Sequence, residues 1–209
     1  MKLLVAGAHG RTGRYIVSLL GDRAKALVRS EDQVESMTDL GAEAVVGDLT
    51  NGSLDRLLSG CDGVIFAAGA GMDGDPEEVD NAGAVRLLKA FKRSGGERFI
   101  MVSSMGTTYP DKMPPMLKPY LVAKRKAEQV LETSGLIYTI VRPGGLTDAP
   151  GSGWVDIAPA LNRGGSVPRE DVARAVVAAV DMSTTYNTVF DMLSGDTPIL
   201  EALQNLTNA

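Results

Sequence analysis

The chain has 209 residues, which suits one domain with a sizeable core. Its composition is 44% hydrophobic and 22% charged, as is ordinary for a soluble globular protein, and its net charge of −5 argues against a general nucleic-acid binder. No run approaches the roughly 18 apolar residues of a membrane span, and the first residues lack a signal-peptide pattern. We therefore expect a cytoplasmic protein that binds neither nucleic acid nor a membrane.

The chain holds one cysteine and one histidine, and these counts exclude several kinds of site. Cys61 cannot form an internal disulfide, which fits a reducing compartment. With His9 as the only histidine, the chain cannot build a usual structural zinc site, so no metal is expected. A Ser-His-Asp hydrolase would also have to use His9, and the position of His9 in a glycine-rich turn argues against that chemistry.

The first thirty residues predict a nucleotide-binding unit. An apolar strand near residues 2–6 leads into a helix over 11–20, and a second apolar strand follows at 24–28. The turn and the helix start carry three glycines at triplet spacing: Gly7, Gly10 and Gly13. The first glycine allows a tight turn, the second lets the backbone approach a pyrophosphate, and the third lets the helix pack closely on the strand. Free N–H groups at the helix start then face the phosphates.

Arg29, at the end of the second strand, favours NADP(H) over NAD(H). An acidic residue there would accept hydrogen bonds from the ribose hydroxyls of NAD, whereas an arginine pairs with the 2′-phosphate of NADP. The first acidic residues after this strand are Glu31 and Asp32. Arg11, inside the glycine turn, is expected to add a second cation near the same phosphate.

Strands and helices alternate along the rest of the chain. The strands are predicted near residues 2–6, 24–28, 43–47, 62–67, 98–103, 136–142 and 187–192. The helices are predicted near residues 11–20, 31–40, 53–58, 76–93, 119–133, 169–181 and 198–206. This alternation, with strands that are continuously apolar, predicts an α/β fold with a doubly wound parallel sheet buried on both faces. We expect a single domain over residues 1–209.

Two irregular segments, residues 105–119 and 143–168, break this alternation. Both are rich in proline, and the second is also rich in glycine and holds the only tryptophan, Trp154. Both follow strands, so we expect them at the carboxyl edge of the sheet, where ligands bind in open α/β folds. We assign the substrate side of the protein to these two loops.

A set of three residues around the first irregular segment has the chemistry of a proton-transfer site. Ser104 follows a strand, and Tyr120 and Lys124 lie one helical turn apart on the inward face of the helix near 119–133. The same reasoning places four residues of this helix in water: Arg125, Glu128, Gln129 and Glu132. A lysine on a buried face needs a partner, for which we propose the ribose hydroxyls of a nicotinamide nucleotide. Its charge would lower the pKa of Tyr120, which could then exchange a proton with an alkoxide while Ser104 orients the substrate oxygen.

These features together resemble the short-chain dehydrogenase/reductase superfamily, and in detail its compact, atypical branch, which is NAD(P)-binding and similar to NAD-dependent epimerases and dehydratases. The motifs that carry the resemblance are, in chain order, the glycine turn, Gly47-Asp48-Leu49, Ala67-Ala68-Gly69, Ser103-Ser104, Tyr-x-x-x-Lys at Tyr120 and Lys124, and Val141-Arg142-Pro143-Gly144. The resemblance covers nearly the whole chain. It implies a Rossmann fold with short C-terminal substrate-binding elements.

The resemblance also assigns roles to residues. It implies that Asp48 and Leu49 flank the adenine, that Ala67 to Gly69 pass the ribose, and that Pro143 and Gly144 lie beside the nicotinamide. The catalytic residues would be Ser104, Tyr120 and Lys124. The full set expected to bind the cofactor is Gly7, His9, Gly10, Arg11, Thr12, Gly13, Arg29, Asp48, Leu49, Ala67, Ala68, Gly69, Ser103, Lys124, Pro143 and Gly144.

Three functions remain open from the sequence. The leading one is an NADP(H)-dependent oxidoreductase that acts on a small carbonyl or alcohol. The second is an epimerase or dehydratase that acts on a nucleotide sugar, and the third is a non-catalytic module that senses NADP(H). A homodimer, formed by pairing the helices near 76–93 and 119–133, is also open, and the charge pattern does not require it.

Overall fold

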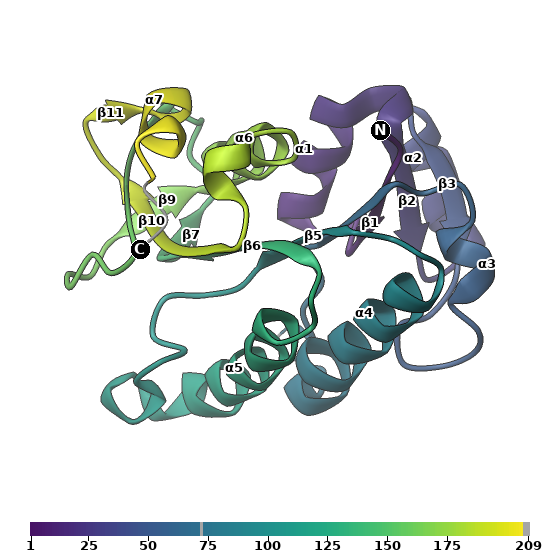
Figure 1. Cartoon of the computed structure of the whole chain (residues 1–209), viewed down its shortest axis with the longest axis horizontal. Helices are drawn as coiled ribbons and strands as arrows, with labels where there is room; N and C mark the ends of the chain where they lie inside the picture. The colour runs from purple at the N-terminus through teal and green to yellow at the C-terminus, as the bar shows by residue number, and fades with distance from the viewer. Residues whose placement is uncertain (72, 207–209) are drawn as a thin grey trace.

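The computed structural model describes residues 1–71 and 73–206, and in it strands and helices alternate as expected (Figure 1). The strands are β1 Leu3–Ala6, β2 Ala24–Val28, β3 Glu43–Val46, β4 Gly63–Phe66, β5 Arg98–Val102, β6 Ile137–Pro143, β7 Gly145–Thr147, β8 Trp154–Ala158, β9 Ser166–Pro168, β10 Thr188–Ser194 and β11 Thr197–Pro198. The α-helices are α1 Arg11–Leu20, α2 Val34–Thr38, α3 Asp55–Leu58, α4 Ala84–Arg93, α5 Lys118–Glu132, α6 Arg169–Ala179 and α7 Ile199–Gln204. None of the helices in the described ranges is long and apolar enough to cross a membrane.

The large sheet has the strand order β11-β8-β10-β6-β5-β4-β1-β2-β3. From β3 to β10 every neighbouring pair is parallel, and the chain leaves β1 first toward β2 and β3 and then returns to β4 on its other side. This reversal of strand order beside β1 is the switch point of a doubly wound sheet, where ligands bind. The predicted fold class is therefore confirmed.

Helices cover both faces of the sheet, which explains why the strands are apolar throughout. In β1, Leu3 and Val5 face the layer that holds α1 and α6, while Leu4 and Ala6 face the layer that holds α4 and α5. Figure 1 shows these two helix pairs on opposite sides of the strands. Because successive residues of a strand point to opposite faces, a sheet covered on both sides buries every residue of its central strands.

The edge of the sheet differs from the prediction. β8 pairs antiparallel with β10, and β11 pairs antiparallel with β8, so the sheet is parallel only up to β10. Residues 143–168, predicted to be an irregular loop, hold β7, β8 and β9, and β7 pairs with β9 in a separate two-stranded sheet. The strands β7 and β9 are only three residues long, and their glycines and prolines hide the alternating pattern that identifies longer strands.

The helix predicted over residues 76–93 has two parts. Residues Glu77–Gly83 form a π-helix, and α4 continues from Ala84 to Arg93. Segments of π-helix are rare and occur frequently at functional sites. This one packs against α5, the helix that carries Tyr120 and Lys124.

Candidate active site

A cavity of about 470 Å³ opens at the carboxyl ends of β1, β2 and β4, beside the switch point of the sheet. Nine residues predicted to bind the cofactor line it: Gly7, His9, Gly10, Arg29, Asp48, Leu49, Ala67, Ala68 and Gly69. The remaining lining residues were not predicted: Leu27, Val28, Gln33, Gly47, Thr50, Ala70, Gly74, Asp75, Glu78 and Val79. The glycine turn, the end of β2 and the segment after β4 thus meet around one space, as the sequence motifs imply.

The three glycines of the turn are needed for different physical reasons. Gly7 has a φ of +83°, and a Cβ added to it would lie 2.6 Å from the backbone of Ala68. A Cβ on Gly13 would collide with the carbonyl oxygen of Gly7, so α1 could not begin where it does. Gly10 has an ordinary φ of −68°, and a Cβ there would meet only the Gly7 oxygen, at 3.1 Å. At Gly10 the constraint therefore comes from the cavity that this residue lines, not from the backbone conformation.

The charges around the cavity favour a phosphorylated ligand at two places. No side chain caps the N-terminus of α1, and its first turn holds no acidic residue, so its free N–H groups and positive dipole end remain available beside Gly10. Arg29 is exposed, and within the described ranges its guanidinium has no carboxylate partner. The backbone N–H of Arg29 donates a hydrogen bond to the side chain of Gln33, which also lines the cavity.

Arg11 takes a different position from the one predicted. Its guanidinium pairs with a carboxylate oxygen of Asp148 at 2.5 Å, and the other oxygen of Asp148 pairs with Arg169 at 2.7 Å. Arg11 therefore reaches toward the segment 143–168 and does not line the cavity beside Arg29. The prediction that Arg11 and Arg29 both meet one phosphate stays a prediction, and in this structure the exposed Arg11 pairs with the exposed Asp148.

Lys124 is buried, as predicted, but its partners are groups of the protein. Its Nζ lies 3.0 Å from the carbonyl oxygen of Ala68, 3.2 Å from that of Val102 and 3.0 Å from Oδ1 of Asp80. Ala68 lines the nucleotide cavity, so the ammonium group contacts the cavity wall from the side of α5. The predicted partner of this lysine was a ribose hydroxyl of the cofactor, and the charged partner in the structure is Asp80 of the π-helix.

Tyr120 lies one turn before Lys124, and its ring centroid is 5.9 Å from the lysine Nζ. Burial raises the pKa of Tyr120 above its ordinary value. Lys124 and the nearby hydroxyl of Ser104 each lower this pKa, and Asp80 raises it, so burial and Asp80 outweigh the two opposing contributions. The prediction of a net lowered pKa is therefore wrong in this structure, and the Tyr120 hydroxyl is protonated at neutral pH.

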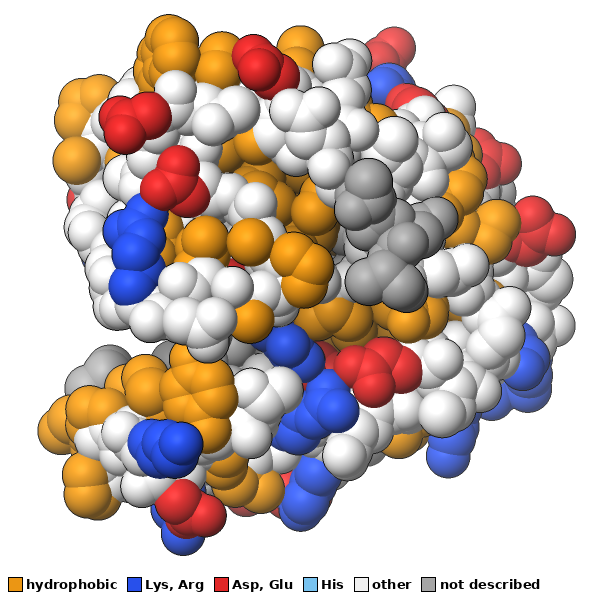
Figure 2. All heavy atoms as spheres, turned by 60° about the vertical axis from the view of Figure 1, so that its left-hand side comes forward, with side chains coloured by type: hydrophobic (Ala, Val, Ile, Leu, Met, Phe, Trp, Pro, Cys, Tyr) orange, Lys and Arg blue, Asp and Glu red, His pale blue; other side chains and the backbone are white. Residues whose placement is uncertain are grey.

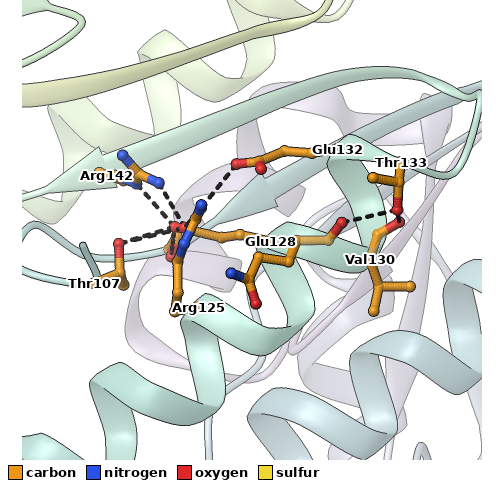
Figure 3. A network of polar contacts seen from close by, with 9 residues as sticks. Thr107, Arg125, Glu128, Val130, Glu132, Thr133 and Arg142 are labelled. Carbon is orange, nitrogen blue, oxygen red and sulfur yellow. Dashed lines mark hydrogen bonds and ion pairs between the residues drawn. The ribbon is translucent and has the colours of Figure 1, made fainter.

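Glu128 was predicted to face water, but it is fully buried at the centre of a polar network (Figure 3). Its two carboxylate oxygens accept hydrogen bonds from Arg142 at 2.9 and 2.6 Å, and Arg125 and Thr107 also contact it. Burial alone would raise the pKa of Glu128, but the hydrogen bonds and charge of Arg142 outweigh burial and hold this pKa below its usual range. The correction has a simple reason: Glu128 lies one turn after Lys124 on the same helix face, where Arg142 of β6 supplies the opposite charge.

Ser103 belongs to the same network. It is buried, and its hydroxyl donates a hydrogen bond of 2.6 Å to Glu128. Its backbone N–H bonds to the carbonyl oxygen of Val141. The structure therefore gives Ser103 a partner other than the cofactor, in contrast to the prediction.

Comparison with known proteins identifies the family. Residues 7–183 match the family model described as NAD(P)H-binding. The chain belongs to the NAD(P)H-binding family. It is 43% identical to the sugar epimerase YhfK of Bacillus subtilis, itself described as uncharacterized, over 99% of this chain and 100% of that one. It is 28% identical to sanguinarine reductase of Eschscholzia californica, over 98% of this chain and 93% of that one.

The fold agrees with the same family. A solved structure of a proposed NAD-dependent epimerase/dehydratase from Bacillus halodurans superposes with a TM-score of 0.94 at 37% identity, and the match covers 99% of this chain and 100% of that one. The oxidoreductase ylbE of Lactococcus lactis superposes with a TM-score of 0.88 at 30% identity, over 99% and 96% of the two chains. The predicted resemblance to epimerase/dehydratase-like members of the short-chain dehydrogenase/reductase superfamily is thereby confirmed.

The cavity fits the dinucleotide that the NAD(P)H-binding family takes. Gly7 and Gly10 bring bare backbone to the start of α1, where a pyrophosphate is held in such folds, and Arg29 lines the same cavity directly after β2. Four other residues predicted to bind cofactor do not line this cavity: Thr12, Gly13, Pro143 and Gly144. Gly144 instead packs against β10, where its N–H bonds to the carbonyl oxygen of Met192.

The two predicted substrate loops follow β5 and β6, at the carboxyl edge of the sheet. Figure 2 shows a furrow between the part of the molecule that carries β8, β11 and α7 and the part that carries α5 and the segment before it. Hydrophobic side chains lie on both sides of the furrow, and basic side chains lie where the two sides approach. In segment 105–119, Met116 and Leu117 are exposed.

Sequence reasoning missed that Asp80 and Glu128 are buried, although helical spacing indicates it for both. Glu128 lies four residues after the buried Lys124. Asp80 lies in register with Ala84, Leu87 and Phe91, which are buried, so helical periodicity placed it on the inward face. A buried acid and the buried Lys124 on the neighbouring helix are natural partners, because each would be costly to bury alone. Only the packing of the π-helix against α5 shows that they meet.

Proposed function

We propose that this protein is an NADP(H)-dependent oxidoreductase that acts on a small carbonyl or alcohol. One observation carries the proposal: the hydroxyls of Tyr120 and Ser104 lie together beside Lys124, whose ammonium group contacts the wall of the nucleotide cavity through Ala68. In this proposal Tyr120 would be the proton donor beside a bound nicotinamide. The name of sanguinarine reductase, a full-length relative, supports the same class of reaction.

The residues that would hold the cofactor follow from the cavity. Gly7, Gly10 and the first turn of α1 would bind the pyrophosphate, and Arg29 would bind the 2′-phosphate. The segment from Ala67 to Gly69 would pass the ribose. When bound, the reduced cofactor supplies a hydride to the carbonyl carbon of a substrate.

Residues of this chain would then orient the carbonyl oxygen of the substrate and donate a proton to it. Ser104 would donate a hydrogen bond to the carbonyl oxygen and orient it, and Tyr120 would transfer its hydroxyl proton to that oxygen as the alkoxide forms. Segments 105–119 and 143–168 would hold the rest of the substrate in the furrow of Figure 2. The hydrophobic sides of that furrow suit a substrate with an apolar body.

A second candidate is epimerase or dehydratase chemistry on a nucleotide sugar. It is favoured by the printed name of the Bacillus subtilis relative, which covers the whole chain. Both reactions would use the same cofactor cavity and the same Tyr120. They differ in that an epimerase returns its cofactor unchanged, so it shows no net consumption of NADPH.

The test is NADPH consumption, followed by absorbance at 340 nm, over a panel of aldehydes, ketones and quinones, beside a binding titration. Tyr120→Phe should lower turnover by about 10²–10⁴-fold and leave NADPH affinity near the parent value, because the ring remains while the proton donor is lost. Tyr15→Phe, an exposed tyrosine of α1, is the matched control. Full activity in Tyr120→Phe would refute the catalytic role. Tight binding with no NADPH consumption on any substrate would refute the oxidoreductase and favour either the epimerase or the sensing module.

A further inference from the structure

Asp80 is a fully buried carboxylate that the proposed reaction does not use directly. Its Oδ2 accepts a hydrogen bond of 2.9 Å from the backbone N–H of Ala70, and its Oδ1 lies 3.0 Å from Nζ of Lys124. A Cβ added to Gly69 would lie 3.3 Å from the same Oδ1, so Asp80 stands directly behind the wall of the nucleotide cavity. Within the described ranges Oδ1 accepts no hydrogen bond of good geometry, and the charge of Lys124 is what compensates it.

The ammonium group of Lys124 is contacted by three groups of the protein, two as hydrogen-bond acceptors and one as an ion-pair partner. They are the carbonyl oxygens of Ala68 and Val102 and the carboxylate of Asp80. The lysine is 2% exposed, so water does not replace any of these partners. Its positive charge is therefore matched by one negative charge inside the protein.

The charges of both Lys124 and Asp80 act on the hydroxyl of Tyr120. From the elements packed around it, the charged groups that act on its hydroxyl are Lys124 and Glu128 of α5 and Asp80 of the π-helix. The charge of Glu128 is itself matched by Arg142 and Arg125. A lysine without Asp80 would attract a phenolate on Tyr120, whereas a lysine paired with Asp80 exerts much less net attraction.

We propose that Asp80 is a positioning residue that neutralises Lys124 and thereby keeps the Tyr120 hydroxyl protonated, so that the site is set to donate a proton to a carbonyl oxygen and not to remove one from an alcohol. This inference rests on the proposed oxidoreductase function. In the reaction, the carbonyl carbon gains a hydride, the O–H bond of Tyr120 breaks, its proton goes to the substrate oxygen to give the alcohol, and the phenolate regains a proton from water. Asp80 touches none of the reacting atoms.

The π-helix positions the carboxylate of Asp80 between α5 and the segment after β4. The Glu77–Gly83 segment packs against α5, and the carboxylate it presents reaches both Lys124 and the N–H of Ala70. Burial together with Asp80 raises the pKa of Tyr120, in agreement with the geometry. Asn at this position removes the charge and keeps the hydrogen bond to Ala70 through its amide oxygen, while its NH2 group then faces Lys124 in place of Oδ1.

The experiment is an ultraviolet titration of tyrosine ionisation in the protein without added nucleotide. The tyrosinate signal of Tyr120 is obtained as the difference between each variant and the same variant carrying Tyr120→Phe. In Asp80→Asn, Tyr120 should ionise at a pH lower than in the parent by about one unit or more, since the lysine charge is no longer compensated. Glu77→Gln, an exposed acid of the same π-helix that pairs with Lys126, is the matched control and should leave the titration unchanged.

A second variant keeps the inference testable if Asp80→Asn does not fold. The double variant Asp80→Asn with Lys124→Met removes both charges and should return the Tyr120 titration to near the parent value. An unchanged titration in Asp80→Asn, or a shift that persists in the double variant, would overturn the role of Asp80. This readout needs no substrate, so it can fail while NADPH-dependent turnover stands, and it can succeed while no substrate is found.

With a substrate, the same residue should also move the pH profile. Asp80→Asn should shift the pH profile of alcohol oxidation to lower pH in parallel with the tyrosinate titration, and Glu77→Gln should not. A purely structural role would lower turnover equally at every pH. Equal loss at every pH, with no shift of the profile, would contradict the proposal.

Discussion

The nucleotide cavity and the interior around α5 differ in whether their charged side chains are paired. In the cavity, Arg29 forms no ion pair with a carboxylate of the described residues and the first turn of α1 holds no acidic residue, although Asp48, Asp75 and Glu78 also line the cavity. Around α5, each buried acid is paired: Glu128 with Arg142 and Asp80 with Lys124. An uncompensated cation on an open surface can bind an anionic ligand, whereas a buried charge without a partner lowers the stability of the fold.

This difference predicts two separate classes of variant. Substitutions in the cavity should lower affinity for the nucleotide and leave stability nearly unchanged. Substitutions in the buried pairs should lower stability, or change how Tyr120 ionises, with no direct loss of phosphate binding. The following changes test this separation, beginning with the largest expected effect.

Glu128→Gln should lower the free energy of unfolding by about 3–5 kcal/mol, because it leaves Arg142 buried without its main carboxylate partner. The measurement is urea unfolding at neutral pH. Glu132→Gln, which removes a half-buried acid that pairs only with Arg125, is the control and should cost about 1 kcal/mol or less. Equal stabilities for the two variants would show that the Glu128 network is not a main source of stability.

Gly10→Val should reduce NADPH affinity by at least about a hundredfold while the fold persists. The new side chain would occupy cavity space beside the start of α1, and its Cβ would meet only the Gly7 oxygen, at 3.1 Å. Calorimetry gives the affinity and far-ultraviolet circular dichroism checks the fold. Gly164→Val is the matched control, because a Cβ there meets nothing within 4 Å. Normal binding by Gly10→Val would mean that the phosphates lie elsewhere.

Arg29→Asp should remove most of the preference for NADP(H) over NAD(H), a loss of about tenfold or more in NADPH affinity. A hydrogen bond to a charged group contributes about 1.5–3 kcal/mol, and Arg11 is held by Asp148 and gives no second contact of this kind. Lys89→Asp, the same change of charge at an exposed position of α4, controls for net charge. Equal affinity of the parent protein for the two cofactors would refute the assignment of Arg29.

The acid sensitivity of the protein should depend on Glu128. Because the folded-state pKa of Glu128 is below its ordinary value, its contribution to stability is complete above about pH 4.3 and is lost as the pH falls through the folded-state pKa. The stability difference between the parent and Glu128→Gln should therefore be constant from pH 7 to pH 5 and shrink toward pH 3. Urea unfolding at these pH values measures it, and a difference that stays constant down to pH 3 would contradict the prediction.

Local sequence determined most of the framework. The strands β1 and β2, the helix α1 and the glycine turn between them depend on neighbours in the chain, and their predicted positions agree with the structure to within one residue. The inward face of α5 was also predicted correctly at Lys124, which is buried in the structure. Nine cavity residues could be named in advance. Gly7, His9, Gly10 and Arg29 followed from the first strand–turn–helix–strand unit, and Asp48, Leu49 and Ala67 to Gly69 followed from the resemblance to the family.

The tertiary structure alone decided which charges meet. Asp80 with Lys124, Glu128 with Arg142, and Arg11 with Asp148 each join segments far apart in the chain. Periodicity shows that a residue points inward, but it does not show which residue of another element lies opposite. The free energy of a buried charge is set by that opposite residue, and for this reason the sequence could name Tyr120 and Lys124 while the protonation state of Tyr120 depended on Asp80.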